Sequence, residues 1–369
     1  MQYRTFGDVR TSILGFGCMR FPHDAQGKVD EKATFAMLDE AYAQGVNYYD
    51  TAYPYHDQTS ELILGRWLKT IDRTSVYVAS KSPVWMIDDI AGFDAMLDNQ
   101  LARLQVEYLD FYLLHALNKE RFAKLEAMGL FAHLASLKAS GKVKHIGFSF
   151  HDEYEVFAKI IQHYPWDFCQ IQYNYMDTNY QAGSKGYQLA RNLNIPLVIM
   201  EPIRGGMLAN VPSEIQALFA SYDQASPASW ALRWVMAHDN VMCVLSGMSN
   251  LEQLRDNIAT ANSVWELDEA QHAIYAKAQA LFAKRIQIAC TACRYCMPCA
   301  FGVDIPRNFR IYNEGHIYQL VDHNKKEYLF MDAGKRSTAC RKCSACVAKC
   351  PQHIDIPSML EIISKAYSE

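Results

Sequence analysis

Short apolar segments alternate with segments of helical spacing through the first 285 residues. The apolar segments are rich in β-branched and aromatic residues, and Gly or Pro stands at several joints, as at Gly45 and Pro196. They predict buried strands. Eight strands are predicted, at residues 12–19, 46–51, 76–81, 108–115, 145–150, 168–174, 196–202 and 241–247. Helices are predicted at residues 31–44, 182–192, 227–238 and 251–261, with Phe35, Leu38 and Tyr42 forming one stripe of the first.

Eight strands and intervening helices in under 300 residues favour an α/β fold of the (β/α)8 type, a TIM barrel. A doubly wound parallel sheet is the alternative, although it usually needs fewer strands. Barrel enzymes place their chemistry at the C-terminal ends of the strands. Each polar residue at those ends has an ordinary explanation as a cap or turn residue, but together they predict a site. They are Asp50, Lys81, His115, Ser149, Gln172, Asn174 and Glu201.

Composition excludes several classes of protein. Half of the 369 residues are apolar and 21% are charged, which is typical of a globular protein of two or three domains. The net charge of −4 argues against a nucleic-acid partner held by phosphate contacts. No run of about 18 apolar residues occurs, and the first residues lack the features of a signal peptide. We therefore expect a cytoplasmic protein without a membrane or nucleic-acid partner.

Eight of the eleven cysteines fall between positions 290 and 350, which predicts a metal-binding domain over residues 286–369 behind a barrel over residues 1–285. The second quartet has the spacing C-x2-C-x2-C-x3-C-P of the bacterial ferredoxin run for a 4Fe–4S cluster. The first quartet is one residue shorter, and the sequences that follow the two quartets form an internal repeat. A four-cysteine zinc site is the alternative. The quartets are Cys290, Cys293, Cys296, Cys299 and Cys340, Cys343, Cys346, Cys350.

The predicted barrel also carries a series of short blocks in a fixed order. Residues 50–55 read Asp-Thr-Ala-Tyr-Pro-Tyr and are followed by Ser60-Glu61 and Gly65. Residues 78–81 read Val-Ala-Ser-Lys, residues 109–115 read Leu-Asp-Phe-Tyr-Leu-Leu-His, and residues 146–149 read Ile-Gly-Phe-Ser. Residues 246–249 read Ser-Gly-Met-Ser. In this order the blocks, spread over residues 16–260, resemble the aldo-keto reductase family, and the C-terminal region resembles ferredoxin-type domains.

The resemblance implies a catalytic tetrad of Asp50, Tyr55, Lys81 and His115. A free tyrosine has a pKa of about 10 and donates protons poorly at neutral pH. Because a neighbouring ammonium favours the phenolate, Lys81 is expected to lower the pKa of Tyr55. Asp50 would hold Lys81, His115 would orient the carbonyl oxygen, and Tyr55 would supply the proton. Tyr53 is a rival for this acid role, but the family spacing from Asp50 favours Tyr55.

The family resemblance also implies NADP or NAD as cofactor, bound across the barrel rim. No Gly-x-Gly-x-x-Gly follows a strand, so a Rossmann site has no support. Phe150, Met200 and Gln253 depart from common family residues, and Gln253 replaces an arginine of NADP-preferring members, so the choice of nucleotide stays open with Arg204 and Arg255 as substitutes. The implied nucleotide contacts are Gly17, Met19, Ser149, Gln172, Met200, Gly205, Ser246, Gly247, Met248, Gln253 and Asn257.

For the cysteines, the resemblance implies one cluster on Cys290, Cys293, Cys296 and Cys350, and a second on Cys340, Cys343, Cys346 and Cys299. A single cluster with a degenerate second site is the alternative, because the first quartet is shortened. A nicotinamide transfers two electrons as hydride whereas a cluster transfers one, and a flavin could connect the two.

Three functions follow from these features. The first is a nicotinamide-dependent reductase of aldehydes or ketones whose clusters are structural or transfer electrons. The second is an electron-transfer oxidoreductase in which the clusters feed a flavin or substrate in the barrel, with a redox protein as partner. The third is a non-catalytic redox-sensing or assembly subunit.

Overall fold

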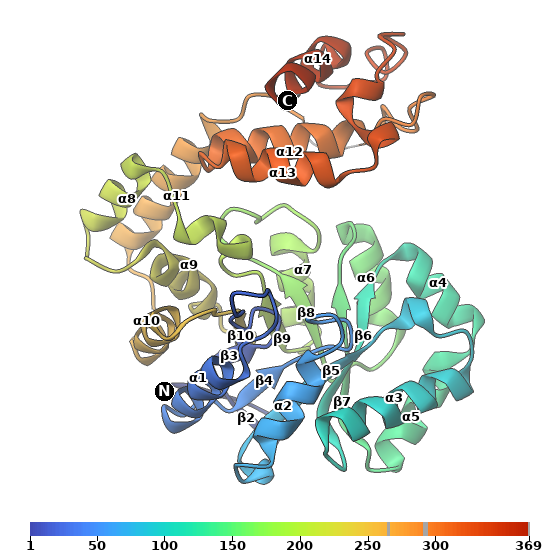
Figure 1. Ribbon diagram of the computed structural model, residues 1–369, viewed down its shortest axis with the longest axis vertical. Coiled ribbons are helices and arrows are strands. Elements are labelled where there is room, and N and C mark those ends of the chain that lie inside the picture. Colours follow the sequence, from blue (N-terminus) through green and yellow to red (C-terminus); the bar gives the residue numbers. More distant parts are fainter. Residues whose placement is uncertain (264–265, 291–293, 368–369) are drawn as a thin grey trace. The chain divides into compact units, whose positions relative to one another are not determined.

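The computed structural model describes residues 1–263, 266–290 and 294–367 (Figure 1). The chain divides into two compact units. One comprises Met1–Ala209 and Ala225–Asp268, and the other comprises Asn210–Gln224 and Glu269–Glu369. Among the described residues, no helix is both long and apolar enough to span a bilayer.

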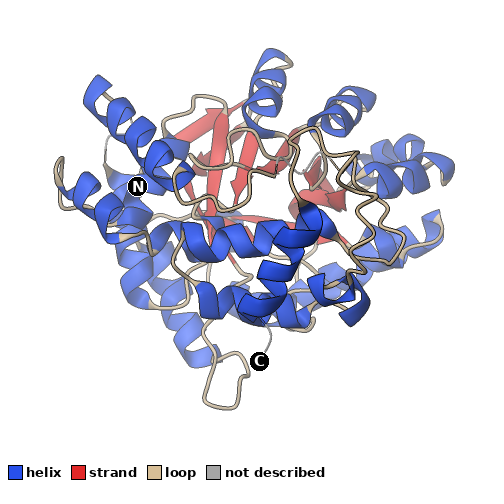
Figure 2. Cartoon of the chain, turned by 90° about the horizontal axis from the view of Figure 1, so that it is seen from above, coloured by secondary structure: helices blue, strands red, loops and turns tan. Residues whose placement is uncertain are grey.

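The first unit is a closed barrel of eight parallel strands, which confirms the predicted fold class (Figure 2). Each predicted strand is present, and neighbours in the sequence are neighbours in the barrel. The register pairs Asp50 with Ala79 and Lys81 with Leu113, so the carboxyl ends of three consecutive strands meet. The strands are β3 (Leu14–Gly17), β4 (Tyr48–Asp50), β5 (Tyr77–Ser82), β6 (Leu109–Leu117), β7 (Val143–Phe150), β8 (Phe168–Gln172), β9 (Leu197–Met200) and β10 (Val241–Ser246).

Helices surround the barrel, and several begin at a side chain that accepts a hydrogen bond from the first turn. Asp30, Asp89, Asn118, Ser226 and Asn250 are such caps, and each satisfies a backbone N–H that the helix leaves free. The helices of this unit are α1 (Glu31–Ala43), α2 (Ser60–Leu68), α3 (Ile90–Leu104), α4 (Lys119–Ala127), α5 (Leu130–Ala139), α6 (Tyr154–His163), α7 (Gly183–Asn192), α9 (Pro227–Met236) and α10 (Leu251–Asn262).

Two local features differ from the sequence prediction. An antiparallel hairpin of β1 (Tyr3–Phe6) and β2 (Val9–Ser12), turning at Gly7 with a φ of 60°, precedes the barrel. In α1 the fully buried face includes Met37 and Ala41, whereas Phe35 and Tyr42 are only partly buried. The predicted stripe is therefore rotated, because the neighbouring helices and strands decide which face of α1 is covered.

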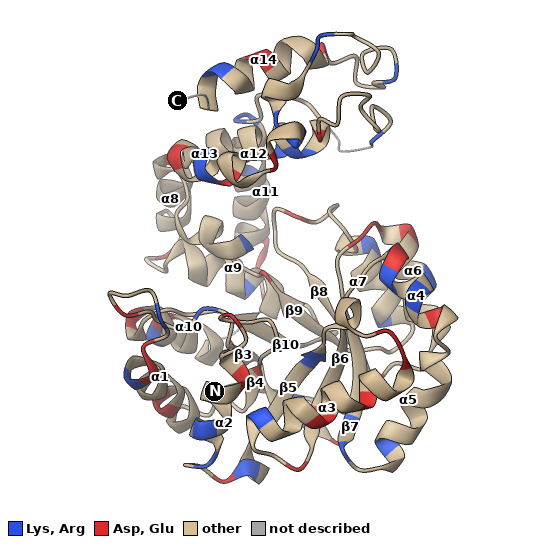
Figure 3. Cartoon of the chain, turned by 45° about the vertical axis from the view of Figure 1, so that its right-hand side comes forward, with Lys and Arg blue, Asp and Glu red and all other residues tan. Residues whose placement is uncertain are grey.

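Charged residues lie mostly on the helices and outer loops of the barrel unit, and the strands are mostly uncharged (Figure 3). This distribution follows the cost of burying an unpaired charge. Among the described residues, the buried charged side chains of this unit are Asp50, Glu61, Lys81, Asp110 and Asp177. Lys81 pairs with Asp50, and each of the other three acids pairs with an arginine.

The second unit is helical and contains the cysteine loops. Its helices are α8 (Ser213–Ala220), α11 (Glu269–Ala283), α12 (Ile305–Ile317), α13 (Val321–Phe330) and α14 (Ile356–Tyr367). Its core includes Val303, Phe309, Tyr328, Leu360 and Ile363. Helix α11 belongs to this unit by its contacts. The boundary between residues 285 and 286 remains a prediction.

The internal repeat is visible in the backbone of the second unit. Arg294 and Ser344, fifty positions apart, both have a φ of 60°, and Gly302 and His353, fifty-one apart, have φ values of 83° and 52°. These are the two offsets of the sequence repeat. Each half then enters a helix that begins Ile-Pro, α12 or α14. The two cysteine loops therefore share these turns in the residues that the structure describes.

Candidate functional site

Lys81 lies at the centre of a buried polar group at the rim of the barrel. Its side chain is fully buried, and its ammonium donates to Asp50 Oδ1 at 2.5 Å and to the Thr51 carbonyl at 2.9 Å. The same nitrogen lies 3.3 Å from the phenol oxygen of Tyr55. Asp50 lies at the end of β4, Lys81 lies on β5, and Tyr55 lies on the loop after β4. The structure thus brings these three predicted residues into direct contact.

Desolvation and charge act against each other in this group. Burial lowers the pKa of Lys81, but Asp50 and then Tyr55 outweigh it and leave the pKa above its ordinary value. Burial likewise raises the pKa of Asp50, with Lys81 opposing. For Tyr55, burial raises the pKa, Lys81 lowers it and Asp50 raises it, and the result is a raised pKa. The expected net lowering is therefore wrong for this structure, because the surrounding protein desolvates the phenol more strongly than Lys81 favours the phenolate.

His115 completes the predicted tetrad from the end of β6. Its ring is 6.1 Å from that of Tyr55, at an interplanar angle of 81°. Burial, Lys81, His151 and Arg121 hold the pKa of His115 well below its ordinary value, so the imidazole is neutral near pH 7. A neutral imidazole can donate one N–H to a carbonyl oxygen. Tyr55 and His115 both keep part of their surface exposed, so a small molecule can reach them.

The rival acid, Tyr53, has a different environment. The Arg103 guanidinium lies 5.0 Å from the centre of the Tyr53 ring, whereas Lys81 donates to Tyr55. The geometry therefore supports Tyr55 as the residue that the ammonium acts on.

A buried network anchors the loop that carries Tyr55. Three residues after Tyr55, at positions 56–58, have left-handed φ values of 50°, 50° and 68°, which non-glycine residues adopt only when the surroundings hold them. Ser60 Oγ donates to the Cys18 carbonyl at 2.9 Å, and Arg103 donates to Glu61 at 2.8 Å and to the Gln58 carbonyl. Sequence analysis quoted Ser60 and Glu61 as part of a block but missed this role. The role of Arg103 could not be found from the sequence near Tyr55, because Arg103 lies on α3, far along the chain from the loop that it holds.

The predicted nucleotide residues of the fifth to seventh strands are partly engaged with protein. Ser149 Oγ accepts from the Ala116 N–H at 2.7 Å. Gln172 Nε2 donates to Asp177 Oδ2 at 2.8 Å, so a ligand would compete for that amide. Met200 is half-buried at the end of β9, and the Gln170 amide nitrogen lies 3.4 Å from its sulfur.

The predicted residues near the first and last strands form a second group. Gly17 and Ser246 belong to paired strands, and a Cβ on Gly17 would lie 3.2 Å from the Ser246 carbonyl oxygen, so this position favours glycine for packing. Met19 is 57% exposed, whereas Met248 is buried. Inside this group Asn257 donates to Ser246 Oγ at 2.7 Å, and Gln253 Oε1 accepts from the Ser249 N–H at 2.8 Å.

Arg20 connects two of the predicted nucleotide segments and was missed. A Cβ on Gly247 would lie 3.0 Å from Arg20 Cγ, and a Cβ on Gly205 would lie 3.5 Å from Arg20 Nη2. The exposed guanidinium is therefore beside Gly205 on the rim. The two arginines named from the sequence are held elsewhere, Arg204 by Asp177 and Arg255 by Glu40. No sequence signal marks Arg20, because the glycines lie about 185 and 227 positions away.

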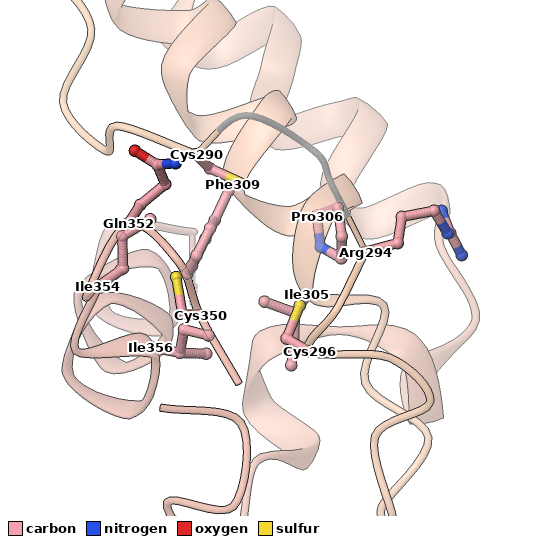
Figure 4. A pocket seen from close by; sticks show the side chains of 10 residues that line it. All are labelled: Cys290, Arg294, Cys296, Ile305, Pro306, Phe309, Cys350, Gln352, Ile354 and Ile356. Carbon is pink, nitrogen blue, oxygen red and sulfur yellow. The ribbon is translucent and has the colours of Figure 1, made fainter. Parts of the chain in front are cut away.

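The described cysteines of the second unit gather in two places. Cys290, Cys296 and Cys350 line one pocket with apolar side chains including Ile305 and Phe309 (Figure 4). Cys293, the fourth residue predicted here, lies outside the described residues. In residues 1–290 and 294–367, apart from 264–265, no three Cys, His, Asp or Glu side chains converge as ligands of one ion do. The cysteines instead border an open pocket.

The second place surrounds Cys346. Burial raises the pKa of the Cys346 thiol, and Cys340, Cys343 and Cys299 add to it as neighbouring acidic groups. The Lys342 N–H lies 3.4 Å from the Cys340 sulfur. Cys299 of the first quartet is thus among the acidic neighbours of Cys346, and Cys350 of the second quartet lines the pocket with Cys290 and Cys296. The ligand sets themselves stay a prediction.

Comparison with known proteins agrees with both units. A model of the aldo/keto reductase family matches residues 13–280, and a model of the 4Fe-4S dicluster domain matches residues 289–354. A probable aldo-keto reductase 1 of Glycine max is 26% identical over 284 residues, which cover 67% of this chain and 80% of that protein. The NADH-specific methylglyoxal reductase of Escherichia coli (strain K12) is 25% identical over 302 residues, covering 69% and 91%.

The fold has solved counterparts. The structure of an aldo-keto reductase from Bacillus halodurans in its holo form has a TM-score of 0.63 and 23% identity, and it covers 75% of this chain and 96% of that chain. Since the family match spans well over half of the residues, the chain belongs to the aldo/keto reductase family of NAD(P)-dependent oxidoreductases and carries a 4Fe-4S dicluster domain after its barrel.

Proposed function

We propose that this protein reduces the carbonyl group of a small aldehyde or ketone with a nicotinamide nucleotide, and that Tyr55 is the proton donor. The observation that carries the proposal is the Lys81 ammonium, which is fully buried and touches both Asp50 and the phenol of Tyr55. A buried lysine held charged beside a partly exposed tyrosine is an arrangement that stabilises a phenolate as it forms.

The tetrad supports a short sequence of steps. The nicotinamide, when bound, supplies the hydride. The carbonyl oxygen accepts hydrogen bonds from the Tyr55 hydroxyl and from the neutral imidazole of His115. As negative charge develops on that oxygen, Tyr55 transfers its proton, and Lys81 stabilises the phenolate that remains. Asp50 keeps Lys81 charged and in place, because its carboxylate lies 2.5 Å from the ammonium.

The rim offers groups suited to a nicotinamide nucleotide. Ser149 and Gln172 would hold the carboxamide, although Gln172 must then share its amide with Asp177. Nothing described lies within 4 Å of a Cβ built on Gly206, and Arg20 lies beside Gly205, so backbone and guanidinium can approach a pyrophosphate there. Gly17, Met19, Met200, Ser246, Gly247, Met248, Gln253 and Asn257 remain proposed contacts. Both NADH and NADPH belong in the assay.

For the second unit we propose two 4Fe–4S clusters. Cys290, Cys293, Cys296 and Cys350 would hold one, and Cys340, Cys343, Cys346 and Cys299 would hold the other. The grouping of the described cysteines supports these sets, and the apolar lining in Figure 4 suits a cubane. The hydride step in the barrel needs no single electron, so we propose that the clusters do not take part in it.

The proposed function is tested by anaerobic purification followed by iron, sulfide and flavin analysis. Oxidation of NADH and NADPH is then followed with a panel of aldehydes and ketones. We expect carbonyl-dependent oxidation of at least one nucleotide by flavin-free protein. Turnover that requires flavin would support the electron-transfer function instead, and inactivity with the whole panel would contradict the proposal.

The pH profile of carbonyl reduction should be flat through neutral pH. Reduction needs protonated Tyr55 and neutral His115. The pKa of Tyr55 is raised above its ordinary value of about 10, so the rate should fall only above that pH. The pKa of His115 is lowered from about 6.5, so the neutral form is lost only at more acidic pH. A fall of kcat with a midpoint between about pH 7 and 9 would contradict the assignment of Tyr55, and a rise of kcat over the same range would contradict that of His115.

Cluster ligation can be read from iron content. Cys350→Ser should lower bound iron by about four atoms per chain, the content of one cluster, as should the double variant Cys290→Ser/Cys350→Ser. Cys346→Ser combined with Cys350→Ser should remove both clusters. Cys169→Ser, a buried barrel cysteine, is the control and should keep its iron. Loss of both clusters in Cys290→Ser/Cys350→Ser would contradict the proposed ligand sets, provided that the protein remains folded by circular dichroism.

A further inference from the structure

We infer that the preferred substrate carries a carboxylate in addition to its carbonyl group, and that the guanidinium of Arg121 binds it. This inference rests on the proposed function and names the class of substrate, an oxo acid. It follows from a row of neighbouring side chains that runs from Tyr55 through His115 and Trp85 to the guanidinium of Arg121.

The backbone fixes Arg121 beside His115. Arg121 lies in the first turn of α4, where its N–H donates to the Asn118 side chain at 2.8 Å. Its Nη1 reaches back to the carbonyl of Ala116, the residue after His115, at 2.7 Å. Ala116 has a left-handed φ of 52°, a conformation that costs energy for alanine and is found at functional sites. The end of β6 is thus bent where it meets Arg121.

Trp85 bridges Arg121 and the tetrad. The Arg121 guanidinium carbon lies 4.6 Å from the centre of a Trp85 ring, and that ring lies 5.2 Å from the ring of His115. His115 in turn lies 6.1 Å from Tyr55. Trp85 is 40% exposed, so part of its side chain can contact a ligand. A molecule whose carbonyl is at Tyr55 would run along Trp85 toward Arg121.

Arg121 is not held in an ion pair by a carboxylate among the described residues, although its chain neighbour Glu120 opposes the lowering of its pKa by burial. Other arginines of the barrel unit, such as Arg73, Arg103 and Arg255, are each held by a carboxylate at 2.6–2.8 Å. Within the part of the chain that the structure describes, Arg121 forms no ion pair. It also lowers the pKa of His115, as a smaller cause after burial, Lys81 and His151. A charge kept near the reacting groups without a carboxylate in contact is suited to an anionic part of the substrate.

The donor geometry favours a carboxylate. A guanidinium has five N–H donors in a planar fork, and the contact to Ala116 uses one of its terminal nitrogens. The rest of the fork can bind the two oxygens of a carboxylate. The pKa of His151, which follows β7, is lowered by burial and to a smaller extent by Arg121, so this side chain adds a neutral hydrogen-bonding group. A phosphate monoester would bring about two negative charges to a single guanidinium.

Matched substrates test the inference. Kinetics are measured for 2-carboxybenzaldehyde against benzaldehyde, and for succinic semialdehyde against butanal. For the wild type, kcat/KM should be at least tenfold higher for each acid. Arg121→Gln should lower the ratio of kcat/KM for each acid to kcat/KM for its neutral partner at least tenfold, mainly by raising KM for the acid. Arg121→Lys should recover part of the loss. The control is Lys119→Gln, which removes an exposed positive charge from the same helix and should leave both ratios unchanged.

A binding measurement keeps the inference testable without turnover. Benzoate and benzamide are titrated into the full protein by calorimetry, in the presence of the nucleotide that binds. Benzoate should bind at least tenfold more tightly than benzamide, and Arg121→Gln should abolish the difference. Equal binding of both ligands to wild type, or equal use of acids and neutral aldehydes, would overturn the inference while leaving the reductase proposal intact. Inactivity with every carbonyl together with selective benzoate binding would instead contradict the reductase function alone.

Discussion

Replacing Tyr55 by phenylalanine should lower kcat for carbonyl reduction by about 10²–10⁴-fold, the usual contribution of a positioned general acid. The change removes one oxygen, which lies 3.3 Å from the Lys81 ammonium, and keeps the ring that packs near His115. Lys81 keeps its contacts to Asp50 and to the Thr51 carbonyl, so we expect the variant to remain folded. Steady-state kinetics with the nucleotide at saturation measure the effect.

The control for this variant is Tyr53→Phe. Tyr53 lies two residues away on the same loop and packs against Arg103 instead of Lys81. Its loss should change kcat less than about threefold, which corresponds to less than about 0.7 kcal/mol of transition-state stabilisation. Nucleotide affinity, measured by quenching of tryptophan fluorescence, should be equal in both variants and wild type. Equal kcat for Tyr55→Phe and wild type would exclude Tyr55 as the acid.

The second large effect is expected from Lys81→Met, which should abolish reduction and also destabilise the barrel. Both partners of the Lys81–Asp50 pair are almost fully buried. Removal of one partner of such a pair typically costs about 3–5 kcal/mol, because the other charge stays in the protein without compensation. Urea unfolding followed by fluorescence measures this loss, since Trp67 and Trp230 are fully buried in the barrel unit.

The double variant Asp50→Asn/Lys81→Met separates the two roles of this pair. With the carboxylate gone, no uncompensated charge remains, so we expect most of the stability lost in Lys81→Met to return. Reduction should stay at the level of the single variant, because nothing is left to stabilise the phenolate of Tyr55. If the double variant were as unstable as the sum of the single ones, the pair would not be coupled in the way the geometry indicates.

The pattern of apolar segments was sufficient to predict the barrel. Its eight strands are short and buried on both faces, so each is a compact run of β-branched and aromatic residues that can be found without knowledge of its neighbours. Because consecutive parallel strands are adjacent in such a barrel, Asp50, Lys81 and His115 could be placed on one rim from their positions at strand ends. The cysteine quartets are equally local, and their ligand sets followed from the resemblance to ferredoxin-type domains.

Features that depend on packing between distant segments could not be predicted in this way. The buried face of α1 is chosen by the elements that cover it, and it is rotated from the predicted stripe. The hydrogen bond of Gln172 to Asp177 and the position of Arg20 beside Gly205 depend on loops that meet only in the folded chain. Nothing in the order of residues marks Arg103 as the anchor of the Tyr55 loop.

The sequence by itself determined the strand order, the polar residues at the strand ends and the two cysteine quartets, because each depends on residues that are close together in the chain. The tertiary structure alone decided the protonation of the site. Whether the pKa of Tyr55 rises or falls depends on how strongly the folded protein excludes water from the phenol relative to the attraction of Lys81, and here exclusion is the larger effect. The position of the Arg121 guanidinium likewise depends on its hydrogen bond to the carbonyl of Ala116, whose left-handed backbone only the folded chain shows.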